Sequence, residues 1–265
     1  MRPALLLTLL APLSAFATSG GVVGYSGKGG VTCTACHGVG GGAAPTVAIE
    51  GPGSLTAGQT ASYTLRITGG PGFRGGMNVA ASAATVGLTA GAGLVLEGAE
   101  LRHTMPQRFA DGGTSWSFFV TAPTSAGSFT LFGAGNSCNG TGSGGDRSAA
   151  VTRAITVTAA NQPPAISGNP TVEVTSPTTR TLAVVATDDG PQGALVYTWE
   201  ATVAPAPVAF SANDSNAART TMATFTRAGA YTFVVTERDA AGLSAVRTLD
   251  VQVAQAITAA TVLPA

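Results

Sequence analysis

Short runs in which hydrophobic and polar residues alternate are the feature that most constrains the fold of this chain. Tyr63, Leu65 and Ile67 are each separated by one polar residue, and Trp116, Phe118 and Val120 alternate in the same way with Ser117 and Phe119. Successive side chains of a β-strand point to opposite faces, so this period of two predicts strands with one buried face. Glycine- and proline-rich stretches such as residues 69–72 separate the runs. Lys, Glu, Gln and Leu, which favour helices, are scarce. We therefore predict an all-β protein of short antiparallel strands.

The chain of 265 residues is long enough for two such domains, and a linker separates them. The linker is Asn161-Gln162-Pro163-Pro164, in which the prolines cannot join a central strand. We predict a first antiparallel β-sandwich over residues 45–159, a second over 160–256, and a tail over 257–265. In the second domain we expect strands at 171–175, 180–187, 194–201, 208–211, 219–226, 230–236 and 243–253. Seven short strands with Trp199 in a central one are typical of an immunoglobulin-like sandwich.

The N-terminus predicts export. Met1-Arg2-Pro3 precedes an apolar run that ends in Ala15-Phe16-Ala17, a small-x-small cleavage pattern, so residues 1–17 are predicted to be a signal peptide. A bilayer span needs about 20 apolar residues, and we expect no transmembrane segment after cleavage. The predicted location is periplasmic or extracellular, at the cell surface. A net charge of zero gives no electrostatic reason to bind nucleic acid.

Residues 18–44 form a glycine-rich segment that has too few apolar side chains to bury a core, so we expect it to be flexible unless something organises it. Within it lies Cys33-Thr34-Ala35-Cys36-His37, the CxxCH signature of c-type haem attachment. Two thiols three positions apart can each add to one vinyl group, and the next imidazole can then reach the iron. We predict one covalent haem c, with Cys33 and Cys36 as attachment points and His37 as axial ligand.

Three other chemistries are open to the same cysteines. Cys33 and Cys36 could form a disulfide in an oxidising compartment. They could belong to a zinc site, for which His37, His103 and Cys138 are the remaining nitrogen and sulfur donors. A redox CxxC normally starts a helix after a strand, and no strand is expected before Cys33.

The second axial ligand of a haem would come from outside the motif. His103 is the remaining histidine, and the sequence places it just before a strand, where it could also be an ordinary exposed loop residue. Met77 and Met105 are the alternatives, although methionines at such positions more often pack in a core. Cys138 has no role in haem attachment.

Several short stretches resemble the exported bacterial choice-of-anchor V domain proteins. They are residues 24–27 before the CxxCH, and then 76–82, 101–106, 116–123 and 135–146 in the same order. The resemblance covers residues 20–158 and implies a reeler-like β-sandwich with haem attachment, and the His103-Thr104 pair matches its pattern. Cys138 departs from that pattern, and no sorting anchor is found. Residues 160–256 look instead like a PKD or bacterial Ig-like domain.

Acidic residues of the second domain fall at expected strand ends. Asp188, Asp189 and Asp239 could contribute to a Ca²⁺ site, which needs several converging oxygen ligands, but capping of turns is the simpler interpretation. No nucleophile–histidine motif suggests an enzyme. We therefore predict a haem protein for electron transfer or redox sensing with an unknown redox partner. The alternative is a structural or adhesive cell-surface protein whose CxxC forms a disulfide and binds no haem.

Overall fold

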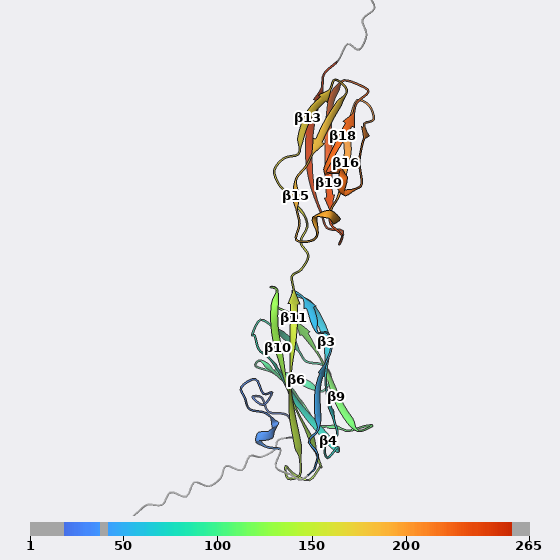
Figure 1. Ribbon diagram of the computed structural model, residues 1–265. Coiled ribbons are helices and arrows are strands. Elements are labelled where there is room, and N and C mark those ends of the chain that lie inside the picture. Colours follow the sequence, from blue (N-terminus) through green and yellow to red (C-terminus); the bar gives the residue numbers. More distant parts are fainter. Residues whose placement is uncertain (1–18, 38–41, 256–265) are drawn as a thin grey trace, which may run out of the picture. The chain divides into compact units, whose positions relative to one another are not determined.

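The computed structural model describes residues 19–37 and 42–255 (Figure 1). The predicted signal peptide, residues 1–17, and the predicted tail, residues 257–265, lie outside this range. The chain forms two compact units, the first ending at Ala160 and the second beginning at Asn161.

The prediction of an all-β fold is confirmed. In the described ranges, three short 3-10 turns are the only helical elements: η1 (Cys33–Ala35), η2 (Gln192–Ala194) and η3 (Asn216–Arg219). None of the helices described here is long and apolar enough to cross a membrane.

The first unit is a sandwich of two sheets. One sheet has the order β1-β3-β9-β5, and the other has the order β2-β11-β10-β4-β7-β6 with β8 paired to β4. The strands are β1 (Thr46–Glu50), β2 (Ser54–Thr56), β3 (Thr60–Thr68), β4 (Arg74–Ala81), β5 (Gly87–Thr89), β6 (Leu94–Glu97), β7 (Glu100–His103), β8 (Gln107–Arg108), β9 (Gly113–Thr121), β10 (Gly127–Cys138) and β11 (Arg147–Thr158).

The core of this unit follows the alternation seen in the sequence. On β3, Tyr63, Leu65 and Ile67 are buried, and the antiparallel register places Leu65 opposite Trp116 of β9. Leu131 of β10 and other buried residues of the seven-stranded sheet complete the same cluster. Burial of these side chains supplies most of the hydrophobic stabilisation of the unit.

The second unit contains the sheets β13-β14-β18-β17 and β16-β19-β20, and a small β12-β15 pair. Its strands are β12 (Ala165–Ile166), β13 (Thr171–Ser176), β14 (Thr179–Ala183), β15 (Ala186–Thr187), β16 (Val196–Val203), β17 (Ala209–Phe210), β18 (Thr220–Thr224), β19 (Gly229–Arg238) and β20 (Ser244–Val253). Trp199 lies buried in β16, and its indole Nε1 donates to the Ala218 carbonyl at 2.8 Å. The strand expected from residue 194 starts two residues later, because η2 occupies 192–194.

The seven-stranded sheet of the first unit has a second, polar face outside the core. The register pairs Gly76 of β4 with Asn136 of β10, and Asn136 with Ser148 of β11, so these residues share a face. Cys138 lies on the same face two residues after Asn136. The N-terminal segment that contains η1 packs against β10 and β11, and Figure 1 shows it as the blue segment beside the sheet.

Candidate functional site

The cysteine motif forms a tight turn. The Thr32 side chain caps η1 by accepting a hydrogen bond from the Thr34 amide at 3.3 Å. The amides of Cys36 and His37 both donate to the Cys33 carbonyl, at 3.3 and 2.9 Å. Cys33 and Cys36 are both half-buried and carry free thiols, not a disulfide. The turn therefore holds two thiols and an imidazole on one short stretch of backbone.

The glycine-rich segment before this turn is organised by the polar face of the sheet. The Glu100 carboxylate, 9 % exposed, accepts hydrogen bonds from the amides of Gly24 and Tyr25 at 3.0 and 3.1 Å. Asn78 Nδ2 donates to the Val22 carbonyl at 2.6 Å and to Glu100 at 2.8 Å. Side chains of the sheet therefore satisfy backbone groups of a segment that has no core of its own.

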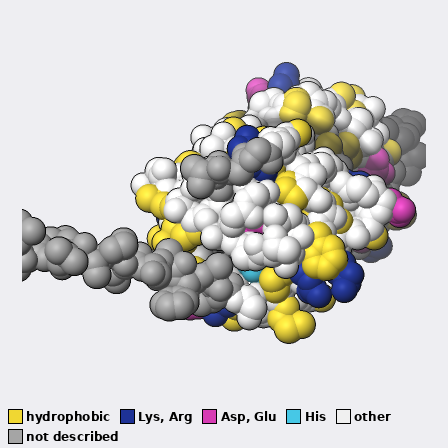
Figure 2. Space-filling model, turned by 90° about the horizontal axis from the view of Figure 1, so that it is seen from below, with side chains coloured by type: hydrophobic (Ala, Val, Ile, Leu, Met, Phe, Trp, Pro, Cys, Tyr) yellow, Lys and Arg dark blue, Asp and Glu magenta, His cyan; other side chains and the backbone are white. Residues whose placement is uncertain are grey.

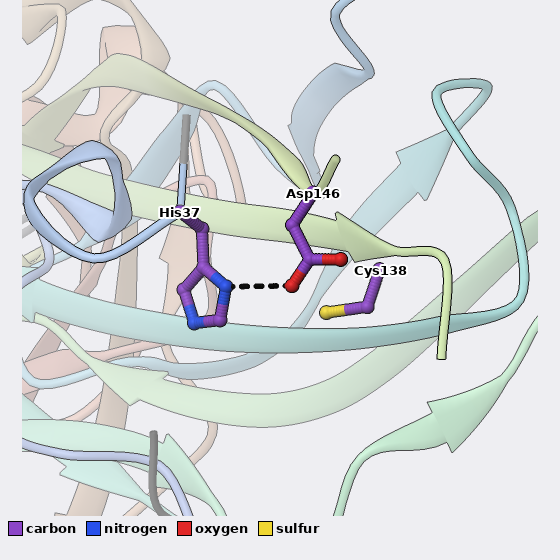
Figure 3. Close-up of side chains that lie close together, drawn as sticks. All are labelled: His37, Cys138 and Asp146. Carbon is purple, nitrogen blue, oxygen red and sulfur yellow. Dashed lines mark hydrogen bonds and ion pairs between the residues drawn. The ribbon is translucent and has the colours of Figure 1, made fainter. Parts of the chain in front are cut away.

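His37, Cys138 and Asp146 converge where β10 ends and β11 begins (Figure 3). His37 Nδ1 lies 2.8 Å from Asp146 Oδ2, and the Asp146 side chain is only 1 % exposed. One donor atom from each of the three residues lies within 4.8 Å of the other two. Figure 3 shows the Cys138 sulfur pointing into the space beside this His–Asp pair.

Further hydrogen bonds fix these three side chains. The other oxygen of Asp146 accepts from the Asn139 amide at 2.9 Å. Ser148 Oγ donates to the His37 carbonyl at 2.6 Å, and Asn136 Nδ2 contacts the Cys138 sulfur at 3.2 Å. The group is thus held by β10, β11 and the loop between them.

Two of the thiols are held in the protonated form. Burial raises the pKa of Cys33 to about 12, and the negative charge of Glu100 adds to the effect. Burial also raises the pKa of Cys138 to about 12, with a further contribution from the Asp146 carboxylate. Both are therefore thiols at neutral pH, and neither is a reactive thiolate.

The expectation that His103 could be an exposed loop residue is wrong. It is the last residue of β7 and is only 8 % exposed. The Met77 amide of β4 donates to His103 Nδ1 at 3.0 Å, so the imidazole takes the place of a backbone carbonyl from a neighbouring strand. Nε2 is therefore the ring nitrogen left for a ligand. Burial lowers the pKa of His103, and the charges of Arg102 and His37 lower it further.

Gly76 is required for this packing of His103. A Cβ on Gly76 would clash with His103 Cε1 and lie 2.8 Å from both His103 Nε2 and Asn136 Oδ1. Asn136 Oδ1 is buried and makes no hydrogen bond within the described residues.

The two methionines that sequence analysis offered as haem ligands lie in opposite environments. Met77 is 0 % exposed and belongs to the core of the first unit, whereas Met105 is 71 % exposed. The structure does not bring either one, or His103, into the His37–Cys138–Asp146 group.

A basic and apolar surface adjoins the group. The Phe73 amide donates to the Cys138 carbonyl at 3.0 Å, and its exposed ring lies 5.7 Å from Arg74 Cζ and 5.1 Å from Arg108 Cζ. On the face drawn in Figure 2, Lys and Arg side chains lie beside exposed hydrophobic ones. Cation–π contacts of this kind hold the two guanidinium groups at the surface.

Two of the three acidic residues, Asp188 and Asp239, act in turns as the simpler interpretation proposes, whereas Asp189 contacts a residue far away in the sequence. Asp188 accepts from the Gly190 amide at 3.0 Å, and Asp239 accepts from the Leu243 amide at 2.8 Å. Asp189 accepts from the Gln162 amide at 3.3 Å. Glu237, two positions before Asp239, is 0 % exposed, and its carboxylate makes no hydrogen bond of normal geometry within the described residues.

Sequence analysis missed the residues that hold the motif in place. Asp146 is 109 positions from His37, and Glu100 is 76 positions from Gly24, so no local pattern connects them. One signal in the sequence could have been used. Asn136 and Cys138 lie two residues apart in one strand, so their side chains point to the same face of the sheet.

Comparisons with known proteins add only a general likeness. No protein-family model and no curated protein matches the chain. Solved structures that resemble it include the extracellular domain of protocadherin gammaB4, with 14 % identity, 79 % of this chain and 33 % of that chain covered, and a TM-score of 0.34. Another is the human desmocollin-1 ectodomain, with 13 % identity, 84 % and 39 % coverage, and a TM-score of 0.30. The chain thus spans less than half the length of these ectodomains, and the resemblance to choice-of-anchor V proteins stays a prediction.

Proposed function

We propose that this exported protein carries one covalently attached c-type haem on Cys33 and Cys36 and uses it for electron transfer or redox sensing. The observation that carries the proposal is the hydrogen bond between His37 Nδ1 and the buried Asp146 carboxylate. It leaves Nε2 as the ring nitrogen that can bind iron. Histidines that ligate metals generally donate their other N–H to a carboxylate or carbonyl in this manner.

The residues present fit such a group. Cys33 and Cys36 are free thiols on one 3-10 turn, and His37 follows them directly. When bound, the haem would supply one-electron iron chemistry at this turn. Asp146 would hold the Nδ1 proton and orient the imidazole, and Ser148 would fix the His37 backbone. His103, whose Nδ1 is engaged by the Met77 amide, is our proposed second ligand through Nε2; Met77 is buried in the core, and the exposed Met105 is the alternative.

A redox partner would need a surface near the site, and Phe73 with Arg74 and Arg108 offers one beside Cys138. Electron-transfer encounters are commonly small and steered by charge. We therefore expect a partner with an acidic docking surface and an association rate that falls as salt is added.

Production of the full chain with a cytochrome c maturation system, followed by a pyridine haemochrome spectrum, tests the proposal. We expect a c-type spectrum with one haem per chain. Cys33→Ala and Cys36→Ala should each lower covalent haem, whereas Cys138→Ala, which removes a thiol outside the motif, should retain it. Wild-type protein that carries no covalent haem under these conditions overturns the proposal.

The second candidate is a structural or adhesive envelope protein without haem. The hydrogen bonds of Glu100 and Asn78 to residues 22–25 favour it, since they dock the segment without any cofactor. This candidate predicts a chain that stays free of haem during maturation. It also predicts that loss of the docking bonds weakens the first unit and leaves no redox signal to change.

A further inference from the structure

Cys138 remains unexplained by haem attachment, although it lies beside the proposed haem ligand. Its sulfur, a nitrogen of His37 and an oxygen of Asp146 are the three donor types that bind zinc and similar ions in proteins. They come from a loop turn, the end of β10 and the residue before β11, and all three donor atoms lie within 4.8 Å of one another. Haem attachment does not explain why three such donors, far apart in the sequence, lie so close together.

We propose that His37, Cys138 and Asp146 form a binding site for a divalent transition ion of the zinc type in the chain that carries no haem. Zinc–ligand bonds of 2.0 to 2.3 Å put two ligands of a tetrahedral ion about 3.3 to 3.8 Å apart. Donor atoms within 4.8 Å of one another need only small side-chain movements to reach that spacing. His37 Nδ1 and Asp146 Oδ2, now 2.8 Å apart, would separate slightly as the ion replaces the proton between them, and the Cys138 thiol would release its proton to solvent as its sulfur binds the ion.

The surrounding contacts would hold each ligand. The Asn139 amide binds the Asp146 oxygen that is not needed for the ion, and Asn136 Nδ2 contacts the Cys138 sulfur. Ser148 fixes the backbone at His37. Outer partners of this kind orient metal ligands and commonly raise affinity.

The donor set also selects the ion. One sulfur, one nitrogen and one oxygen suit Zn²⁺ or Co²⁺, whereas Ca²⁺ and Mg²⁺ require mostly oxygen ligands in larger number. Three protein ligands leave a fourth tetrahedral position for water. Because both schemes use His37, a chain would hold either the ion or the haem at this residue, and the ion site does not depend on haem attachment being correct.

Titration of the reduced full chain, produced without haem maturation, with Co²⁺ and then with Zn²⁺ tests the site. We expect a thiolate-to-cobalt charge-transfer band that Zn²⁺ abolishes at one equivalent. Cys138→Ala should eliminate the band, and Asp146→Asn should weaken Zn²⁺ binding by about tenfold or more. Cys36→Ser is the matched control, since it removes a thiol of the motif that is not in the group, and it should leave the band unchanged.

Two results would overturn the site. One is the absence of a cobalt band in the wild-type chain, and the other is a band that persists in Cys138→Ala but disappears in Cys36→Ser, which would place the ion on the CxxC pair. Far-UV circular dichroism of each variant checks folding. If Cys138→Ala is unfolded, Asp146→Asn decides, because its side chain keeps the same shape, and wild-type affinity in that variant also contradicts the proposal.

Discussion

The hydrogen bonds of Glu100 predict how firmly the cysteine segment is held on the sheet. The carboxylate accepts from the amides of Gly24 and Tyr25 and from Asn78 Nδ2, at 3.0, 3.1 and 2.8 Å. Glu100→Gln keeps the side-chain size but turns one acceptor oxygen into an NH₂ group, which faces a donor. One charge-assisted hydrogen bond is lost, at about 1.5 to 3 kcal/mol. That corresponds to about a ten- to 150-fold increase in opening of the segment.

Hydrogen exchange at the Gly24 and Tyr25 amides measures this opening directly, and we expect both to exchange faster by that factor in Glu100→Gln. Alkylation of Cys33 should also accelerate, because the charge of Glu100 contributes to its raised pKa. Glu97→Gln is the control, since its ion pair with Arg102 at 2.7 Å is exposed and worth about 0 to 1 kcal/mol. Unchanged amide exchange in Glu100→Gln would refute the docking account.

Three further substitutions test other parts of the structure. Burial raises the pKa of Glu237, so the folded second unit binds the proton of this carboxyl group more tightly than the unfolded chain does. The free energy of unfolding should therefore fall as pH rises above the ordinary Glu range. Glu237→Gln should remove this dependence in urea titrations at several pH values; a slope that persists would implicate another group. Gly76→Ala should cost about 1 to 3 kcal/mol by crowding His103 in thermal or urea unfolding, whereas Gly29→Ala, where nothing lies within 4 Å, should be neutral. Leu65→Ala should cost about 2 to 5 kcal/mol, and a cost below 1 kcal/mol would contradict its place in the core.

The sequence was most informative about the strands that have one buried face. Tyr63, Leu65 and Ile67 on β3 are buried as their alternation predicts, and so are Tyr231 and Phe233 on β19. Alternation works there because it depends only on the local period of a strand and on the presence of a core. It also accounts for the confirmed all-β fold.

The site was less predictable, because its contacts join residues far apart in the chain. Asp146 meets His37 only after β10 and β11 have paired, and Glu100 looks like an ordinary polar residue until the glycine-rich segment covers it. For His103, just before an expected strand, the sequence left a haem ligand and an exposed loop residue open, because it does not reveal that the ring accepts from the Met77 amide. The contacts of Asp146, Glu100 and His103 are therefore set by tertiary packing and not by the local sequence pattern.

The most direct test of haem attachment is the mass of the peptide that contains Cys33 and Cys36, isolated from chain produced with cytochrome c maturation. Our account predicts one haem added to this peptide, resistant to acidic organic extraction and absent from the peptide that contains Cys138. Two unmodified thiols, or the mass of a Cys33–Cys36 disulfide, would contradict it.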